Sequence, residues 1–131
     1  MSGGAVVAWM IFIFQASSLA PEEVDQSLQA FFWLGKLRSV LGHLALYGVL
    51  ASLLQISLWS WKSNATCQLR WVLAAAALAT LYGITDEYHQ SLVPGRVASL
   101  ADIVIDGIGA LTAAASLKFV AEIASANSKP D

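Results

Sequence analysis

Ionisable and amide side chains are concentrated in residues 85–106 of this 131-residue chain, between two strongly apolar segments. The group combines carboxyl, imidazole, amide and guanidinium side chains: Asp86, Glu87, His89, Gln90, Arg96, Asp102 and Asp106. Carboxylates and imidazoles can exchange protons or bind cations, and a guanidinium binds carboxylate or phosphate through its planar fork. Ionisable groups at membrane depth are costly, so a group of this kind usually marks function.

The composition indicates an integral membrane protein. Hydrophobic residues make up 57% of the chain and charged residues 12%, whereas ordinary globular domains carry roughly 25% charged residues. Too few charged side chains remain to cover a soluble surface, and the apolar residues are grouped into four blocks. We therefore expect an all-α fold, an integral membrane four-helix bundle, formed by a single domain over residues 1–131.

The lengths of the apolar blocks indicate where the polar groups lie. A helix needs about 20 residues to cross a hydrocarbon core roughly 30 Å thick. The uncharged runs 71–85 and 107–117 are shorter than this, so the last two helices must include ionisable residues near their connection. The expected spans are residues 4–20, 39–61, 70–90 and 100–121.

Residues 21–35, after the first span, combine acidic and aromatic side chains. Leu28, Phe31 and Phe32 are at helical spacing, which favours a short interfacial helix; an irregular loop with aromatic anchors is the alternative. For the orientation, the connection 62–70 has two cationic and no acidic residues. Because Lys and Arg near span ends favour the cytoplasmic side, we expect both termini in the cytoplasm and the acidic connection near the outer face.

Helical spacing brings polar side chains from the second and fourth spans to the same level. His43 and Tyr47 are four residues apart and share a face near the start of the second span. Asp102 and Asp106 have the same spacing at the start of the fourth span, and Asp106 is surrounded in sequence by isoleucine and valine. Gly109 continues this face and would let another helix approach closely.

The third span ends in a polar face. Asp86, His89 and Gln90 have i, i+3 and i+4 spacing, with Glu87 turned aside. The connection then reads Val-Pro-Gly-Arg, typical of a tight turn, since proline fixes φ and glycine supplies a positive φ. This turn directs Arg96 back towards the carboxylates. The predicted pocket residues are His43, Tyr47, Asp86, Glu87, Gln90, Arg96, Asp102 and Asp106.

These residues also lie in segments that resemble a known family. The signature of the VanZ-like family of small membrane proteins closely resembles the run TDEYHQSLVPGR at residues 85–96, followed by SLAD and DGIG. The segment from His43 to Tyr47 resembles that family's histidine-and-tyrosine element. Ser17 and Ser18 resemble the serine pair that closes its first helix. The similarity spans nearly the whole chain.

The resemblance implies a protein of the bacterial cytoplasmic (inner) membrane that faces the cell envelope. The namesake of the family is associated with low-level resistance to the glycopeptide teicoplanin, which acts on cell-wall precursors outside this membrane. The implied partners are the lipid bilayer and a lipid-linked envelope precursor or the glycopeptide target. No cofactor and no nucleic-acid partner are expected. Family membership does not define a mechanism.

One interpretation of the polar residues is an anion-binding site. In it, Arg96 and His43 bind an anionic envelope group. Carboxylates outnumber cations in this part of the chain. Either they are protonated, or a divalent cation binds at Asp86, Asp102 and Asp106. No metal is assigned from the sequence.

Three other interpretations remain. In an envelope-lipid-modifying enzyme, Asp86 or Glu87 would act as the base and a histidine as the acid, but the spacing matches no recognised catalytic motif. In a structural protein, the polar groups would only hold the helices together. Proton or ion conduction would need polar groups through the full membrane thickness, and the inner halves of the second and third spans contain little beyond Gln55 and small hydroxyls.

Overall fold

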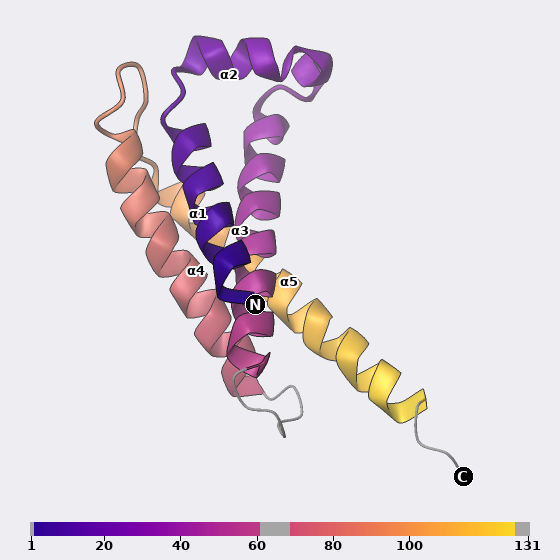
Figure 1. Ribbon diagram of the computed structural model, residues 1–131. Helices are drawn as coiled ribbons and strands as arrows, with labels where there is room; N and C mark the ends of the chain where they lie inside the picture. Colours follow the sequence, from indigo (N-terminus) through magenta and orange to yellow (C-terminus); the bar gives the residue numbers. More distant parts are fainter. Residues whose placement is uncertain (1, 61–68, 128–131) are drawn as a thin grey trace.

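The computed structural model describes residues 2–60 and 69–127, and the regular structure in these ranges is entirely helical. The elements are α1 (Ser2–Ser17), α2 (Pro21–Ser27), the 3₁₀ helix η1 (Gln29–Leu34), α3 (Lys36–Ser60), α4 (Leu69–Gln90) and α5 (Leu100–Asn127). The four longer α-helices form a bundle, and α2 lies across one end of it (Figure 1). The expected all-α bundle is therefore confirmed.

Helix α3 lies at the centre of the bundle and contacts α1, α4 and α5. Small side chains dominate the buried core, which includes Ala51, Ala75, Ala79, Ala110 and Ala114. The closest approach is between α3 and α5, where a Cβ atom added to Gly109 would lie 2.6 Å from the carbonyl oxygen of Leu44. Small residues allow membrane helices to approach and gain close packing, which explains why α3 and α5 can cross here.

Helix α1 is attached to the bundle by two hydrogen bonds to backbone carbonyls. The indole N–H of Trp9 donates to the carbonyl oxygen of Leu46 on α3 at 2.9 Å. The hydroxyl of Tyr82 on α4 donates to the carbonyl oxygen of Met10 at 2.7 Å. Ile13 and Val6 are buried on the same side. These contacts hold α1 against both neighbouring helices.

The chain bends by 112° between α1 and α2. Pro21 begins α2, and the backbone N–H of Ala20 donates to the side chain of Glu23 at 2.9 Å, as in a capping box. Phe31 and Trp33 of η1 are exposed. The segment expected to contain a short helix is helical in two pieces, α2 and η1, because the backbone at Leu28 between them is not helical (φ −108°, ψ 21°).

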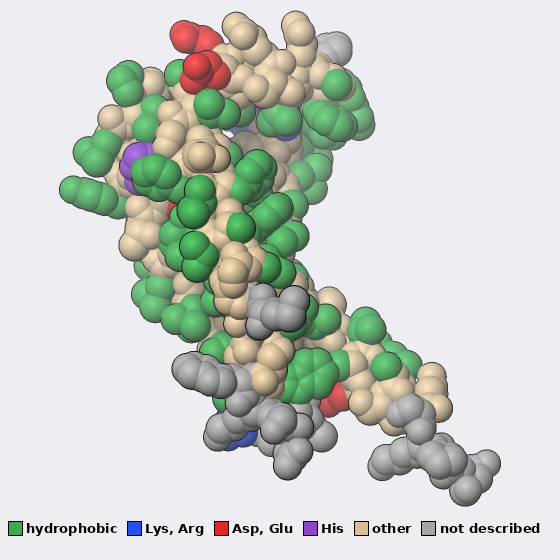
Figure 2. Space-filling view, viewed as in Figure 1, with side chains coloured by type: hydrophobic (Ala, Val, Ile, Leu, Met, Phe, Trp, Pro, Cys, Tyr) green, Lys and Arg blue, Asp and Glu red, His purple; other side chains and the backbone are tan. Residues whose placement is uncertain are grey.

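Two helices, α3 and α5, are long and apolar enough to cross a membrane, and α1 with α2 would make a third if the bent pair were one broken span. Figure 2 shows hydrophobic side chains exposed along the helices and acidic ones gathered near α2. Helix α4 carries Arg70 near its start and Asp86 and Glu87 near its end, which lower its hydropathy. The protein is a membrane protein by composition and fold.

The helix ends agree only partly with the expected spans. Helix α4 begins one residue before the expected span 70–90 and ends with it. Helix α1 covers Ser2–Ser17, not residues 4–20. Helix α3 begins at Lys36, not at residue 39, and α5 continues to Asn127, beyond residue 121. Helical hydrogen bonding continues past the apolar segment because charged side chains are compatible with exposed helix turns. Residues 61–68, which hold the last residue of the expected second span and most of the expected connection 62–70, lie outside the described residues.

Candidate functional site

One end of the bundle collects the predicted polar residues. Successive long helices run in opposite directions, so the start of α3, the end of α4 and the start of α5 meet beneath α2 (Figure 1). All eight predicted residues lie in these segments or in the connection between α4 and α5. That connection contains the expected tight turn: the N–H of Arg96 donates to the carbonyl of Val93 at 3.1 Å, and Gly95 has φ +81°.

His43 and Asp106 form a pair between α3 and α5. The Nδ1 atom of His43 and the Oδ1 atom of Asp106 are 2.9 Å apart, and Asp106 has no exposed surface. Gly83 on α4 makes room for this carboxyl group, because a Cβ atom there would lie 2.9 Å from its Oδ2 atom. The pair therefore depends on three helices.

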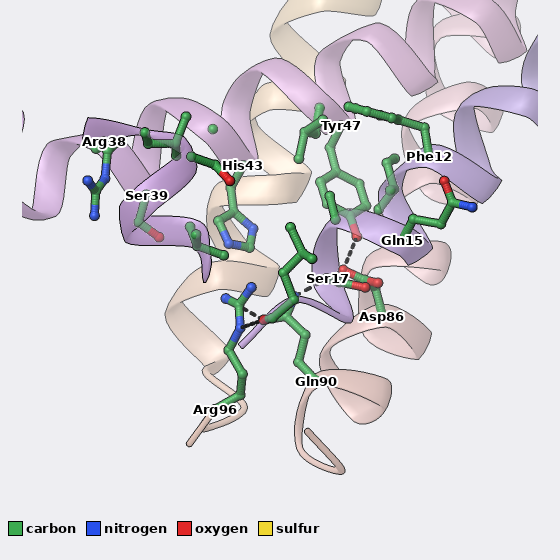
Figure 3. Close-up of a pocket in the computed structure, with 18 residues that line it drawn as sticks. Phe12, Gln15, Ser17, Arg38, Ser39, His43, Tyr47, Asp86, Gln90 and Arg96 are labelled. Carbon is green, nitrogen blue, oxygen red and sulfur yellow. Dashed lines mark hydrogen bonds between the residues drawn. The ribbon is translucent and has the colours of Figure 1, made fainter. Parts of the chain in front are cut away.

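Tyr47 and Asp86 form a second pair, between α3 and α4. The tyrosine hydroxyl donates to Oδ2 of Asp86 at 3.1 Å, and the amide of Gln90 donates to the same atom at 3.0 Å. The guanidinium of Arg96 donates to the amide oxygen of Gln90 at 3.5 Å and to the carbonyl of Leu19 at 3.2 Å. Figure 3 shows this chain of contacts from Tyr47 to Arg96.

Glu87 faces α5. Its Oε2 atom accepts a hydrogen bond from the backbone N–H of Ser99 at 2.8 Å, and its exposed fraction is 2%. Ser99 precedes α5, and its hydroxyl accepts from the N–H of Asp102 at 3.4 Å, as an N-cap residue does. Asp102 is half-buried in the first turn of α5. Glu87 thus helps to fix the start of the helix that carries both aspartates.

Three carboxyl groups each have one buried oxygen with no hydrogen-bond partner in the described part of the chain. These atoms are Oδ1 of Asp86, Oε1 of Glu87 and Oδ2 of Asp106. Buried polar atoms normally have a partner, because losing water without replacing it costs free energy. The three oxygens mark positions where a proton, a cation or a ligand group would be stabilising.

A pocket of about 460 Å³ opens beside these residues under α2 (Figures 2 and 3). Its walls are largely apolar and come from α1, α2 and α3, including Phe12, Ile13, Ala16, Val24, Leu28 and Leu46. Its charged or titratable lining residues are Arg38, His43, Tyr47, Asp86 and Arg96. Arg38 also forms an ion pair with Asp25, which connects α3 with α2. The pocket thus combines apolar walls with charged side chains of both signs.

Comparison with known proteins gives one result. The sequence model of the VanZ/LLP1 family matches residues 4–121, which include all of α3 and α4, most of α1 and α5, and every predicted pocket residue. The chain belongs to the VanZ/LLP1 family. The resemblance seen in the sequence motifs is therefore confirmed. No curated protein and no solved structure matches the chain.

In this VanZ/LLP1 protein, the faces of α4 that carry His89 and Glu87 differ from the prediction. Helical spacing suggested that His89 shares the face of Asp86 and that Glu87 is turned aside. Glu87 is buried against α5, whereas His89 faces α1, where its ring stacks on Phe14 with centroids 4.2 Å apart. Its Nε2 atom lies 2.9 Å from the hydroxyl of Ser18. Of the two serines at the close of the first helix, Ser18 therefore contacts His89, whereas Ser17 lines the pocket.

The sequence reasoning also missed residues that build the VanZ/LLP1 pocket. Arg38 lies one residue before the expected second span 39–61 and is absent from the predicted pocket residues, yet it lines the pocket. Ser99 holds Glu87, and its place immediately before an apolar helical run was a usable N-cap signal. Gly83 had no such signal. A glycine that makes room for a side chain on another helix can be recognised only when the packing of the two helices is known.

Proposed function

We propose that this VanZ/LLP1 protein crosses the bacterial cytoplasmic membrane with α1, α3, α4 and α5 and binds an anionic, lipid-linked component of the cell envelope. The pocket would then lie near the outer face, with both termini in the cytoplasm. The observation that carries the proposal is the pocket under α2, which combines apolar walls with Arg38 and Arg96.

The charges around the pocket favour an anion. Among the described carboxyl groups of the site, Asp86 lines the pocket, whereas Glu87, Asp102 and Asp106 are turned towards the α3–α5 contact and are not lining residues. Asp86 already accepts two hydrogen bonds. Arg38 is ion-paired with Asp25, so Arg96 is the pocket-lining guanidinium that has no ion pair among the described residues. Guanidinium groups bind phosphate and carboxylate groups through paired hydrogen bonds.

The walls favour a lipid carrier. Apolar side chains of α1, α2 and α3 surround the pocket, and burying hydrocarbon against such side chains is favourable at about 25 cal/mol per Å². Glycopeptides act on lipid-linked precursors outside the membrane. A protein that holds such a precursor changes how much of it a glycopeptide can reach, and this connects the pocket with teicoplanin resistance.

The test is to measure binding of a polyprenyl phosphate to the purified protein in detergent micelles. We expect Arg96→Gln to weaken binding at least about tenfold, since a hydrogen bond to a charged group contributes roughly 1.5–3 kcal/mol. Arg96→Lys should retain part of the affinity. The uncharged polyprenol should bind wild type and Arg96→Gln equally. In cells, the wild-type protein should raise teicoplanin tolerance and Arg96→Gln should not.

Arg70→Gln is the matched control. Arg70 is exposed in the first turn of α4, at the opposite end of that helix from the pocket, so both binding and tolerance should remain at the wild-type level. If Arg96→Gln binds the polyprenyl phosphate and raises tolerance as the wild type does, the proposal is wrong.

A structural role for the polar residues is the second candidate, because the Tyr47–Asp86 and His43–Asp106 contacts each join two helices. Interhelical hydrogen bonds in membranes average about 0.6 kcal/mol. Under this alternative, Arg96→Gln would reduce the amount of folded protein. Under the binding proposal, the variant accumulates normally and loses only the ligand.

A further inference from the structure

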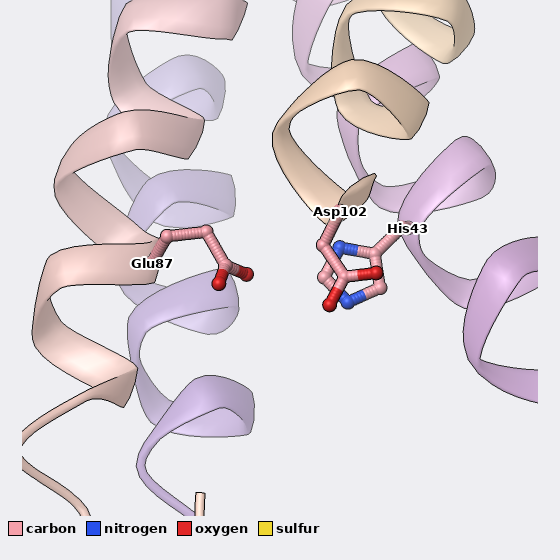
Figure 4. A group of neighbouring side chains, drawn as sticks. All are labelled: His43, Glu87 and Asp102. Atoms are coloured by element: carbon pink, nitrogen blue, oxygen red, sulfur yellow. The ribbon is translucent and has the colours of Figure 1, made fainter. Parts of the chain in front are cut away.

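Three side chains at the pocket end of the bundle lie close enough together to bind one metal ion. One nitrogen of His43 and one carboxylate oxygen each of Glu87 and Asp102 all lie within 4.8 Å of one another. They come from α3, α4 and α5, respectively (Figure 4). Ligand atoms on opposite sides of a metal are at most about 4.4 Å apart, because each lies about 2.0–2.2 Å from it. A small closing movement of the side chains would therefore complete the site.

Glu87 distinguishes this group from an ordinary acidic cluster. Its exposed fraction is 2%, and the hydrogen bond from Ser99 to Oε2 fixes the direction of the carboxylate. Its Oε1 atom is buried and has no partner among the described residues. Figure 4 shows the carboxylate directed towards His43 and Asp102. A cation between the three side chains would satisfy this oxygen and remove the repulsion between the two carboxylates.

Asp106 supplies the support that a metal-binding histidine needs. It holds Nδ1 of His43 at 2.9 Å and is itself fully buried. Nε2 of His43 has no hydrogen-bond partner in the described ranges 2–60 and 69–127 and is the nitrogen left for a metal. Metal-binding histidines usually have their other ring nitrogen bonded to a carboxylate or carbonyl, which sets the tautomer and the ring orientation.

We propose that His43, Glu87 and Asp102 bind a divalent first-row transition metal, Zn²⁺ or Mn²⁺, with Asp106 orienting the imidazole. An imidazole ligand favours these ions over Mg²⁺ and Ca²⁺, which prefer all-oxygen sites. Two carboxylates neutralise a divalent ion, which suits a site inside a membrane protein. The ligand set differs from the three aspartates considered from sequence, because Asp86 is bonded to Tyr47 and Gln90. This proposal does not depend on the anionic lipid.

The experiment measures Zn²⁺ bound to the metal-stripped full-length protein in detergent, by calorimetry and by elemental analysis after dialysis. The wild type should bind one equivalent, and Glu87→Gln and Asp102→Asn should bind none above background. Asp106→Asn should weaken binding by about 10–100-fold. Glu122→Gln, which changes an exposed carboxylate in the last turns of α5, should bind as the wild type does. Mg²⁺ in large excess should not displace the metal.

A second measurement uses the wild-type protein, so it tests the proposal even if the variants fail to fold. Pulsed electron paramagnetic resonance of bound Mn²⁺ should show coupling to an imidazole nitrogen. Absence of stoichiometric metal binding by the wild type, a Mn²⁺ signal with oxygen ligands only, or unchanged binding by both carboxylate variants would each overturn the proposal. These results leave the polyprenyl phosphate test unaffected, so the two proposals can fail separately.

Discussion

Asp106 is the most deeply buried carboxyl group of the site, and its position depends on a glycine in another helix. A Cβ atom at Gly83 would lie 2.9 Å from Oδ2 of Asp106 and 3.2 Å from Cε1 of Tyr47. Both neighbours are held by hydrogen bonds, so neither can move freely. We expect Gly83→Ala to lower the free energy of unfolding by about 1–3 kcal/mol, as overpacking does, in thermal unfolding followed in micelles.

Gly42→Ala is the control for this substitution. Gly42 is also within a helix, but a Cβ atom there would meet nothing within 4 Å. Alanine is favoured over glycine in a helix by about 1 kcal/mol, so this variant should be at least as stable as the wild type. If Gly42→Ala lowered the free energy of unfolding as much as Gly83→Ala, the contact with Asp106 would not be the cause of the destabilisation.

The types of the site residues could be predicted from the sequence, but their partners could not. Spacing on a helix identifies which side chains share a face, and this was correct for Asp86 with Gln90. It does not say how far that helix is rotated against its neighbours. Glu87 therefore faces α5 and His89 faces α1, the reverse of what spacing alone suggested.

The crossing of α3 and α5 depends on Gly109. A Cβ atom at this position would lie 2.6 Å from the carbonyl oxygen and 2.8 Å from the Cα atom of Leu44. Because these are backbone atoms, the helices would have to separate. We expect Gly109→Ala to lower the melting temperature in micelles more than Gly83→Ala does, and to weaken the His43–Asp106 pair, which spans the same two helices.

Gly107→Ala tests whether this effect is local. A Cβ atom at Gly107 would lie 3.4 Å from the hydroxyl of Thr80, an ordinary contact. The variant should unfold close to the wild-type temperature. If Gly107→Ala lowered the melting temperature as much as Gly109→Ala, the close approach of α3 would not explain the need for glycine in this part of α5.

Helix existence could be predicted well and helix ends less well. Apolar blocks bounded by charges located all four long helices, and α4 came within one residue at its start because charged residues stand near both of its ends. Hydropathy marks where a chain can meet lipid, whereas a helix ends where its backbone hydrogen bonds end. Lys36 and Arg38 belong to α3 for this reason, although both were expected outside it.

The end of the bundle that carries the polar site is the end at which α3 and α5 begin, and α5 ends at the opposite end (Figure 1). If the four long helices cross the membrane, Ser91 after α4 and Ala126 near the end of α5 lie on opposite sides. With Cys67 replaced by serine, we expect Ser91→Cys in intact cells to react with an impermeant maleimide. Ala126→Cys should react only after the membrane is permeabilised. Labelling of both positions from one side would contradict the proposed orientation.

The site is assembled by the alternation of helix directions, which is why its place in the molecule could be inferred without a structure. The contributions of α1 and α2 could not be inferred in this way. Their apolar side chains form most of the pocket walls, but in the sequence they look like those of any lipid-facing helix. Only the packing of α1 against α3 and the ion pair of Asp25 on α2 with Arg38 on α3 distinguish a pocket wall from an outer surface.

The attachment of α1 through Trp9 and Tyr82 has a consequence for truncated proteins. The second half of this helix lines the pocket together with Asp86 and Gln90 of α4. A shortened chain that starts after α1 would therefore lose one wall of the pocket, so the N-terminal helix is as integral to the pocket as the side chains that give it charge.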